Sequence, residues 1–310
     1  MSDDRIEKIV QIKAAAKRTL SKEISLLSLL YHLSSNKTAR QHFPLTRSIL
    51  ITSIDVDVGN HILGEINGGK NDRNVHDYMS ERAIGALEET CVPMLISLLE
   101  ELHVPVTFAL RGQLLDVDKS IPNRLLDSNI KFEIAAHGYS HRAFTSMSVN
   151  EAEKEMKMID RAMRKLGIRP ESFIFPRNAI SHLDLLEEHG YRAYRGSGGL
   201  FRDSNRIVRH RRLYDMHPSL FITRDANSKF LMKVLDVSIA RRLPLHIWFH
   251  PKDLGMNERE MKSSIRRVYR PFFEYVLENQ QRNLLQSETM SSAIDFVEKS
   301  VPFFRNAAPT

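Results

Sequence analysis

The chain of 310 residues contains one cysteine, Cys91, and one tryptophan, Trp248. A lone cysteine cannot form an internal disulfide or build a cysteine-based structural zinc site, which excludes a disulfide-stapled secreted scaffold. Any metal ion would therefore have to be held by histidine and carboxylate side chains. The sequence also lacks a run of eighteen uninterrupted apolar residues, the length that a typical membrane-spanning helix needs. We expect a globular protein.

The first ten residues, MSDDRIEKIV, are acidic where a signal peptide would be basic and then apolar. We therefore expect a cytoplasmic location. The chain has 45 Lys and Arg against 38 Asp and Glu, a formal net charge of +7. This excess favours acidic partners such as phosphate-bearing substrates, anionic lipid headgroups or nucleic acid, but it is equally consistent with a surface that only maintains solubility.

The chain divides into an arm and a larger domain. Residues 1–47 form a basic arm in which apolar residues recur at helical spacing between positions 4 and 33. We expect this helical arm to pack on the main domain or on a second copy of the chain, making a homo-oligomer; peripheral contact with a membrane surface is the alternative.

From residue 48 onward, strand-like and helix-like segments alternate, which predicts an α/β domain with a mainly parallel sheet. Ser148 and Glu151 match a capping box at the start of the clearest helix, and Gly167 ends it. We expect strands at 49–58, 104–110, 130–136, 172–176 and 243–249, and helices at 88–102, 149–166, 181–189, 227–242, 258–280 and 288–299.

Three clusters of polar residues fall at the carboxyl ends of predicted strands, where α/β folds place their sites. In the first cluster, Asp55 and Asp57 are two residues apart and project from the same face of a strand. Two like charges on one face are tolerated when a cation or a proton lies between them, or when the strand has already emerged into solvent. The pattern alone leaves these explanations open.

The second cluster, HGYSH, follows a buried strand, and its His137 and His141 are four residues apart. On a helical turn this spacing lets two imidazoles bind one divalent ion, although chance pairs of this kind are common. In the third cluster, alternation places His246, Trp248 and His250 on one face of a strand. Such a wall can stack on an apolar sugar face and offers a titratable imidazole; Trp248 could equally belong to the core.

Taken in order, the segments ITSIDVDVG, VPVTFALRG, FEIAAHGYSH, FIFPRN and LHIWFHP resemble the polysaccharide deacetylase family, also called the NodB homology domain or carbohydrate esterase family 4. The segment SETMSSAIDFV resembles the closing helix of that family. The resemblance covers residues 48–300 and leaves 301–310 as a tail. It implies a distorted, incomplete (β/α) barrel, here with an N-terminal helical arm.

The resemblance also implies a divalent metal ion held by Asp57, His137 and His141. Two histidines and one carboxylate leave open positions for water and a substrate carbonyl, which suits zinc first, with manganese, cobalt or nickel as alternatives. By the same resemblance, Asp55 is the catalytic base and His250 is the acid that protonates the leaving amine.

The resemblance makes Arg177 the residue that orients Asp55. A buried or half-buried Arg177 would need a carboxylate partner, whereas an ordinary surface arginine is the default interpretation. Here Pro176 precedes Arg177, whereas the family pattern is Arg-x-Pro, and Val56 separates the usually adjacent acid pair. Asp215 is the candidate for the second aspartate of the family.

We expect three residues, Trp248, His246 and Tyr139, to contact substrate. His246 is also a rival to His250 as the acid, and we prefer His250 because it lies at the strand end.

The implied activity is that of a metal-dependent hydrolase that removes N-acetyl groups from an amino sugar. The sugar would belong to a polysaccharide, an oligosaccharide or a carrier-linked glycan precursor, and no nucleic-acid partner is expected. Two alternatives stay open. One is hydrolysis of a non-sugar cyclic amide within the same superfamily, and the other is a non-catalytic barrel that binds glycan or nucleic acid.

Overall fold

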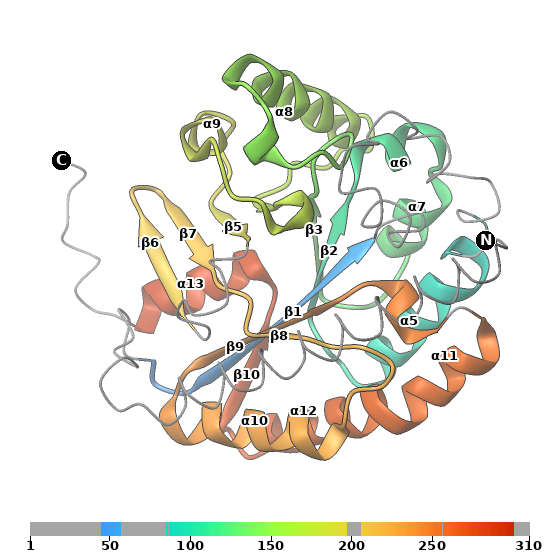
Figure 1. Ribbon diagram of the computed structural model, residues 1–310. Coiled ribbons are helices and arrows are strands. Elements are labelled where there is room, and N and C mark those ends of the chain that lie inside the picture. The colour runs from blue at the N-terminus through green and yellow to red at the C-terminus, as the bar shows by residue number, and fades with distance from the viewer. Residues whose placement is uncertain (1–44, 57–84, 86, 197–205, 256, 301–310) are drawn as a thin grey trace, which may run out of the picture.

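The computed structural model describes residues 45–56, 85, 87–196, 206–255 and 257–300. Asp57, most of the arm expected at 1–47 and the tail at 301–310 lie outside these residues. A curved sheet forms the centre, with most helices on its outer face (Figure 1). The strands are β1 (Ser48–Val56), β2 (Val106–Leu110), β3 (Phe132–Ala136), β4 (Ser172–Ile174), β5 (Ala193–Arg195), β6 (Ile207–His210), β7 (Leu213–Met216), β8 (Leu220–Phe221), β9 (Pro244–Phe249) and β10 (Leu285–Glu288).

Helices follow most strands, as right-handed crossovers require. They are α5 (Val92–Glu101), α6 (Gly112–Val117), α7 (Ser120–Leu126), α8 (Val149–Arg164), α9 (Leu183–Glu188), α10 (Ser228–Arg241), α11 (Glu258–Ser264), α12 (Arg270–Gln281) and α13 (Met290–Ser300). Shorter helical segments are η1 (Leu87–Cys91), η2 (Phe144–Ser146), η3 (Pro176–Asn178), η4 (Pro251–Leu254) and η5 (Ile265–Tyr269).

The strand order is β6-β7-β5-β4-β3-β2-β1-β9-β8, and β10 pairs with the first half of β1. All described pairs are parallel except β6 with β7. The strands β6 and β8 stand at the two ends of this order, so the barrel is unclosed. The predicted fold class, an incomplete (β/α) barrel, is confirmed. Parallel strands bring their carboxyl ends to one edge, which is where such folds place their sites.

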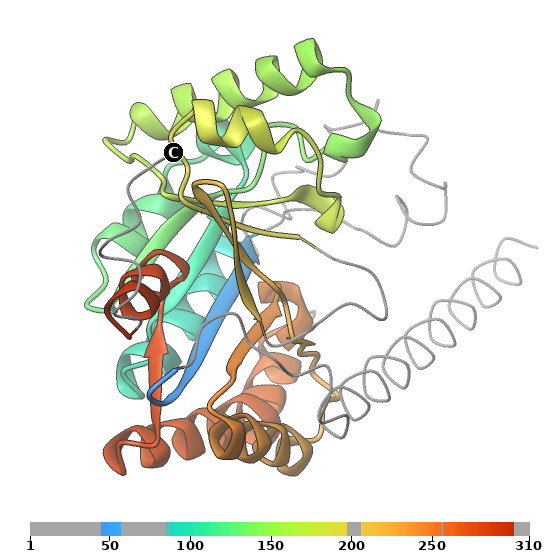
Figure 2. The same ribbon diagram turned by 90° about the vertical axis from the view of Figure 1, so that its left-hand side faces the viewer.

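Two apolar layers follow from the alternation of side chains along the strands. Leu50, Ile54 and Val56 of β1 point outward into the larger core beneath the helices. Ile49 and Ile51 point inward, where α13 packs on the inner face of the sheet through apolar residues such as Ile294. Figure 2 shows β10 leading directly into α13. The inner face becomes polar toward the carboxyl end of β1, at Ser53 and Asp55.

The capping box predicted for α8 is present. The Ser148 hydroxyl accepts from the Glu151 amide at 3.4 Å, and the Ser148 amide donates to the Glu151 carboxylate at 2.9 Å. Gly167 has φ 71°, the left-handed conformation that commonly follows a helix end. Other expectations needed correction. The helix predicted at 288–299 is preceded by strand β10, and the sequence reasoning did not identify β5 to β8, α6 or α7.

Candidate active site

The candidate active site lies at the carboxyl ends of β1, β3, β5 and β9. Asp55 is near the end of β1, His137 follows β3, Arg195 ends β5, and His250 follows β9. These side chains belong to the inward-facing set, because their neighbours one residue away along the chain pack in the outer core. Four segments that are distant in sequence therefore contribute polar groups to the same edge of the barrel.

Asp55 and Arg195 form a buried ion pair. The guanidinium Nη2 of Arg195 donates to Oδ2 of Asp55. Arg195 is 0% exposed and Asp55 is 3% exposed. Burial by itself would raise the pKa of Asp55, but Arg195, together with the neighbouring imidazoles of His137 and His250, outweighs burial and holds this pKa below its usual value. Asp55 is therefore a carboxylate near neutral pH, although it is removed from water.

The arginine that contacts Asp55 is Arg195, so the expectation that Arg177 is its partner was wrong. Arg177 lies in η3 with φ 57° and is exposed. Pro176 starts this 3-10 turn immediately after Phe175, which directs the next residue away from the line of the strand. Sequence reasoning missed Arg195, which ends a strand of three residues.

A chain of hydrogen bonds through Ser53 and His246 holds Arg195 in place. Its Nη1 donates to the Ser53 hydroxyl at 2.8 Å, and Ser53 Oγ lies 2.8 Å from His246 Nε2. His246 Nδ1 lies 2.9 Å from the carbonyl of Met216, which can only accept. His246 therefore carries its proton on Nδ1, and its Nε2 accepts the proton of Ser53. The hydroxyl of Ser53 therefore both accepts from Arg195 and donates to His246.

His246 is a neutral internal residue, so the expectation that it contacts substrate or acts as the acid was wrong. It is 1% exposed, and both of its ring nitrogens are engaged by the protein. Burial, followed by the charge of Arg195, lowers the pKa of His246 to about 3. The preference for His250 as the acid agrees with this geometry.

The HGYSH segment brings His137 and His141 together in a loop and not on the helical turn that the spacing suggested. Gly138 and His141 have φ 65° and 63°, so the chain reverses direction between the two histidines. The two rings meet edge to face with centroids 5.0 Å apart. His137 Nδ1 donates to the Ile174 carbonyl at 2.8 Å, which leaves the lone pair on Nε2.

The donor chemistry of this pair fits two ligands of a divalent ion. A histidine whose Nδ1 is held by a backbone carbonyl presents Nε2 in the neutral, ligating form. The third predicted ligand, Asp57, follows the last described residue of β1, and the described part of the chain holds no group of three acidic, histidine or cysteine side chains arranged for a metal ion. The three-ligand site stays a prediction.

His250 is held by a carboxylate that sequence reasoning missed. Its Nδ1 donates to Oδ2 of Asp253 at 2.6 Å, and its backbone amide donates to the same oxygen at 2.8 Å. Asp253 lies three residues after His250, and a turn that begins with Pro251 starts between them. This spacing is a capping pattern, so the sequence could have revealed the contact.

Asp215, the candidate for a second aspartate, lies on β7 near Tyr194 and His217, and burial raises its pKa to about 7.

An aromatic wall borders the ion pair. The ring of Trp248 lies under the guanidinium carbon of Arg195 at 4.6 Å, and is 4.5 Å from the ring of Phe221 and 5.6 Å from that of His250. Trp248 is half-buried and Phe221 is 40% exposed, so both present apolar surface to solvent. Phe221 lies on the two-residue strand β8, too short to be predicted from its pattern.

Tyr139, expected to contact substrate, makes structural contacts. Its hydroxyl donates to Asp116 of α6 at 2.8 Å. The ring lies so close to α6 that a Cβ added to Gly112 would be 2.6 Å from Tyr139 Cδ2. The hydroxyl is therefore directed to α6 and not to Asp55.

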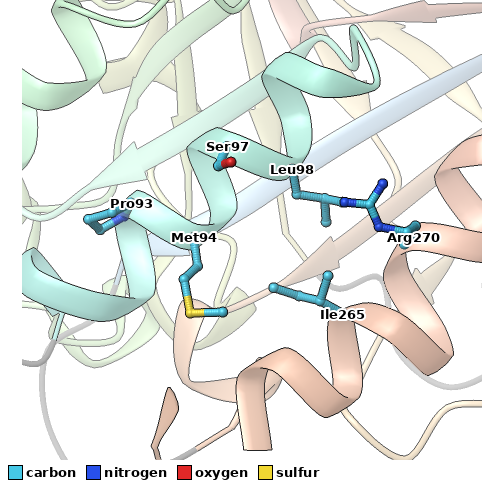
Figure 3. Close-up of a pocket in the computed structure, with 6 residues that line it drawn as sticks. All are labelled: Pro93, Met94, Ser97, Leu98, Ile265 and Arg270. Carbon is cyan, nitrogen blue, oxygen red and sulfur yellow. The ribbon is translucent and has the colours of Figure 1, made fainter. Parts of the chain in front are cut away.

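A groove on the outer side of the molecule lies between α5 and η5 (Figure 3). It has a volume of about 350 Å³ and no predicted site residue in its lining. The lining residues are Pro93, Met94, Ser97, Leu98, Ile265 and Arg270.

Comparison with known proteins agrees with this fold. Residues 77–194 match the family model of polysaccharide deacetylase, and no curated protein matches the chain in sequence. A Mycobacterium smegmatis structure described as a polysaccharide deacetylase has a TM-score of 0.61 and 18% identity over 86% of this chain and 95% of its own. Puue allantoinase has a TM-score of 0.61 and 14% identity, covering 84% and 94%.

A Pseudomonas aeruginosa PAO1 structure, also described as a polysaccharide deacetylase, has a TM-score of 0.59 and 14% identity, covering 83% and 93% of the two chains. At these identities the structural likeness establishes the fold, and the family model identifies the sequence signature within it. The order of the motifs along the strands led to the same assignment. Residues 77–194 thus carry the sequence signature of the polysaccharide deacetylase family, within a fold that is similar to known structures of that description.

Proposed function

We propose that the protein is a metal-dependent hydrolase that removes N-acetyl groups from an amino sugar of a polysaccharide, an oligosaccharide or a carrier-linked glycan precursor. The observation that carries the proposal is the buried Asp55 carboxylate, which Arg195 keeps ionised within electrostatic reach of His137 and His250. A base, a ligand histidine and an acid at one strand edge are the groups that amide hydrolysis requires.

His137, His141 and Asp57 would hold the divalent ion, with zinc as the first candidate. When bound, such an ion polarises an amide carbonyl and lowers the pKa of water. The Ile174 carbonyl supports this role for His137, because it orients the ring and keeps the proton on Nδ1, the tautomer that ligates through Nε2.

The remaining steps belong to the protein's own groups. The Asp55 carboxylate takes a proton from the attacking water, and Arg195 holds that carboxylate in place. His250 gives a proton from Nε2 to the leaving amine, while Asp253 holds its Nδ1 proton and stabilises the cationic ring. Trp248 and Phe221 offer an apolar wall to a sugar face. The residue that contacts Asp55 is Arg195, in the place that the sequence suggested for Arg177.

Acetate release from N-acetylhexosamine oligomers, with and without added zinc, tests the proposal. Asp55→Asn and His250→Ala are expected to lower kcat/KM by about a hundredfold or more, the usual contribution of a positioned acid or base. Tyr139→Phe is the control, since its hydroxyl bonds Asp116, and it should retain most activity. No acetate from any oligomer, or full activity in Asp55→Asn, would contradict the proposal.

Hydrolysis of a non-sugar cyclic amide is the second candidate. It is favoured by the likeness of the fold to an allantoinase, with a TM-score of 0.61. A parallel screen of cyclic ureides distinguishes the two, because ring opening releases no acetate. A non-catalytic binding barrel would be indicated by glycan binding that Asp55→Asn leaves unchanged, in a protein with no turnover.

The cytoplasmic location, the homo-oligomer and the peripheral membrane contact of residues 1–47 are also proposals. In the described ranges, no helix has both the length and the apolar character needed to cross a membrane. Cell fractionation of the full chain tests its location. Light scattering of the full chain and of a variant without residues 1–44 tests whether this segment joins two copies.

A further inference from the structure

The loop that carries His137 and His141 is anchored through its backbone on two sides. On one side, its carbonyls accept hydrogen bonds from the start of α6: Gly112 N donates to Gly138 O at 2.9 Å, and Gln113 N donates to Tyr139 O at 3.1 Å. This anchoring fixes the path of the chain between the two histidines.

On the other side, the loop amides donate to one carboxylate of α8. Glu155 Oε2 accepts from the amide of Tyr139 at 3.0 Å and from that of Ser140 at 2.9 Å. Glu155 Oε1 accepts from the Ser140 hydroxyl. Two consecutive amides directed at one oxygen make a nest for an anion, and here a side chain of the protein fills it.

The position of Glu155 on α8 shows that this contact is not incidental. It lies on the buried face of the helix between Ala152 and Ile159 and is only 8% exposed. An apolar residue would satisfy the amphipathic pattern at lower desolvation cost. The capping of α8 uses Ser148 and Glu151 instead, so Glu155 is not needed to start the helix.

We propose that Glu155 is a positioning residue, which sets the separation and orientation of His137 and His141 for a divalent cation by holding the amides of the two residues immediately before His141. This inference rests on the metal site of the proposed function. His141 has φ 63°, a conformation that is uncommon for a residue with a side chain and persists only where neighbouring contacts hold it. Removal of the acceptor frees the loop on that side.

The test measures Zn²⁺ and Co²⁺ affinity of the full chain by isothermal titration calorimetry. Glu155→Leu keeps the helix face apolar but removes the acceptor. It is expected to weaken metal binding by about 10- to 100-fold, the usual effect of losing a group that orients a ligand. Glu155→Gln still offers an oxygen to both amides but loses the charge, so it should weaken binding only several-fold. Glu153→Leu, two residues away on the same helix, should bind like wild type.

Wild-type affinity in a folded Glu155→Leu protein overturns the inference. If this variant does not fold, Glu155→Gln decides, and an unchanged dissociation constant in that variant also overturns it. Co²⁺ absorption spectra add a readout of ligand geometry, in which a changed band pattern is expected for Glu155→Leu alone. A wild-type chain that binds neither ion refutes the proposed metal site itself, whereas equal binding by wild type and Glu155→Leu refutes only the role of Glu155.

Discussion

Because His246 is buried and neutral, the free energy of unfolding should fall by a calculable amount as the pH is lowered. In the folded protein, burial and the nearby charge of Arg195 lower the pKa of His246 from 6.5 to about 3. In the unfolded chain the imidazole takes up a proton below pH 6.5. Between these values the unfolded state binds more protons, so the stability that His246 contributes is present above pH 6.5 and is lost as the pH falls toward 3.

The size of the effect follows from the linkage between proton binding and unfolding. Each pH unit in this window is worth about 1.4 kcal/mol for one proton. Lowering the pH from 7.5 to 5.0 passes through about 1.5 units of the window, which should cost the wild type about 2 kcal/mol of unfolding free energy through this residue alone.

The measurement compares wild type with His246→Gln by urea unfolding at pH 7.5 and 5.0. The variant loses hydrogen bonds and should be less stable at pH 7.5, by about 1–3 kcal/mol. At pH 5.0 the gap should narrow by about 2 kcal/mol, since the variant has no imidazole to protonate and other groups titrate alike in both proteins. A gap of equal size at the two pH values would refute a neutral, buried His246.

Three further predictions concern stability. Arg195→Met leaves the Asp55 charge buried without its arginine, and urea unfolding should show a loss of about 3–5 kcal/mol; a loss below about 1 kcal/mol would show that water already reaches the carboxylate. Ser148→Ala removes the cap of α8 and should cost about 1 kcal/mol in the same assay, with no change contradicting the capping box. Phe144→Ala empties a fully buried site that faces Phe173, 5.2 Å away between ring centroids, and should cost about 3–5 kcal/mol in thermal or urea unfolding. If the free energy of unfolding hardly changes, the neighbouring aromatic side chains have moved into the cavity left by Phe144.

Long periodic segments and the order of the motifs were sufficient to predict much of the fold. The capping box and the alternating apolar residues of α8 lie within one stretch of chain, so local pattern determines that helix. The strands β1, β2, β3 and β9 were predicted to within a few residues because buried parallel strands are almost continuously apolar. The three-residue strand β4 was found because the apolar run Phe173–Phe175 continues past it, whereas β5 and β8, with three and two residues, lie in mixed polar and apolar segments.

The candidate site was predictable in its location and less so in its partners. Alternation along β9 correctly placed His246, Trp248 and His250 on one face, but it could not tell that His246 is sealed inside while His250 lies at the rim. The sequence likewise indicated a pair of histidines on a helical turn. In the structure the two histidines lie in a loop, whose path is set by residues with positive φ and by contacts with α6 and α8.

The residue types that end the strands follow from local sequence, since each of Asp55, His137 and His250 follows or closes an apolar run that must be buried. Which of these groups come into contact depends on how the strands and helices pack in three dimensions. Arg195 takes the carboxylate that Arg177 was expected to hold, because the ion pair depends on the curvature of the sheet and on the turn at Pro176, and Glu155 reaches the histidine loop from a helix packed outside it. Contacts of this kind join segments far apart in the chain, and side-chain periodicity carries no information about them.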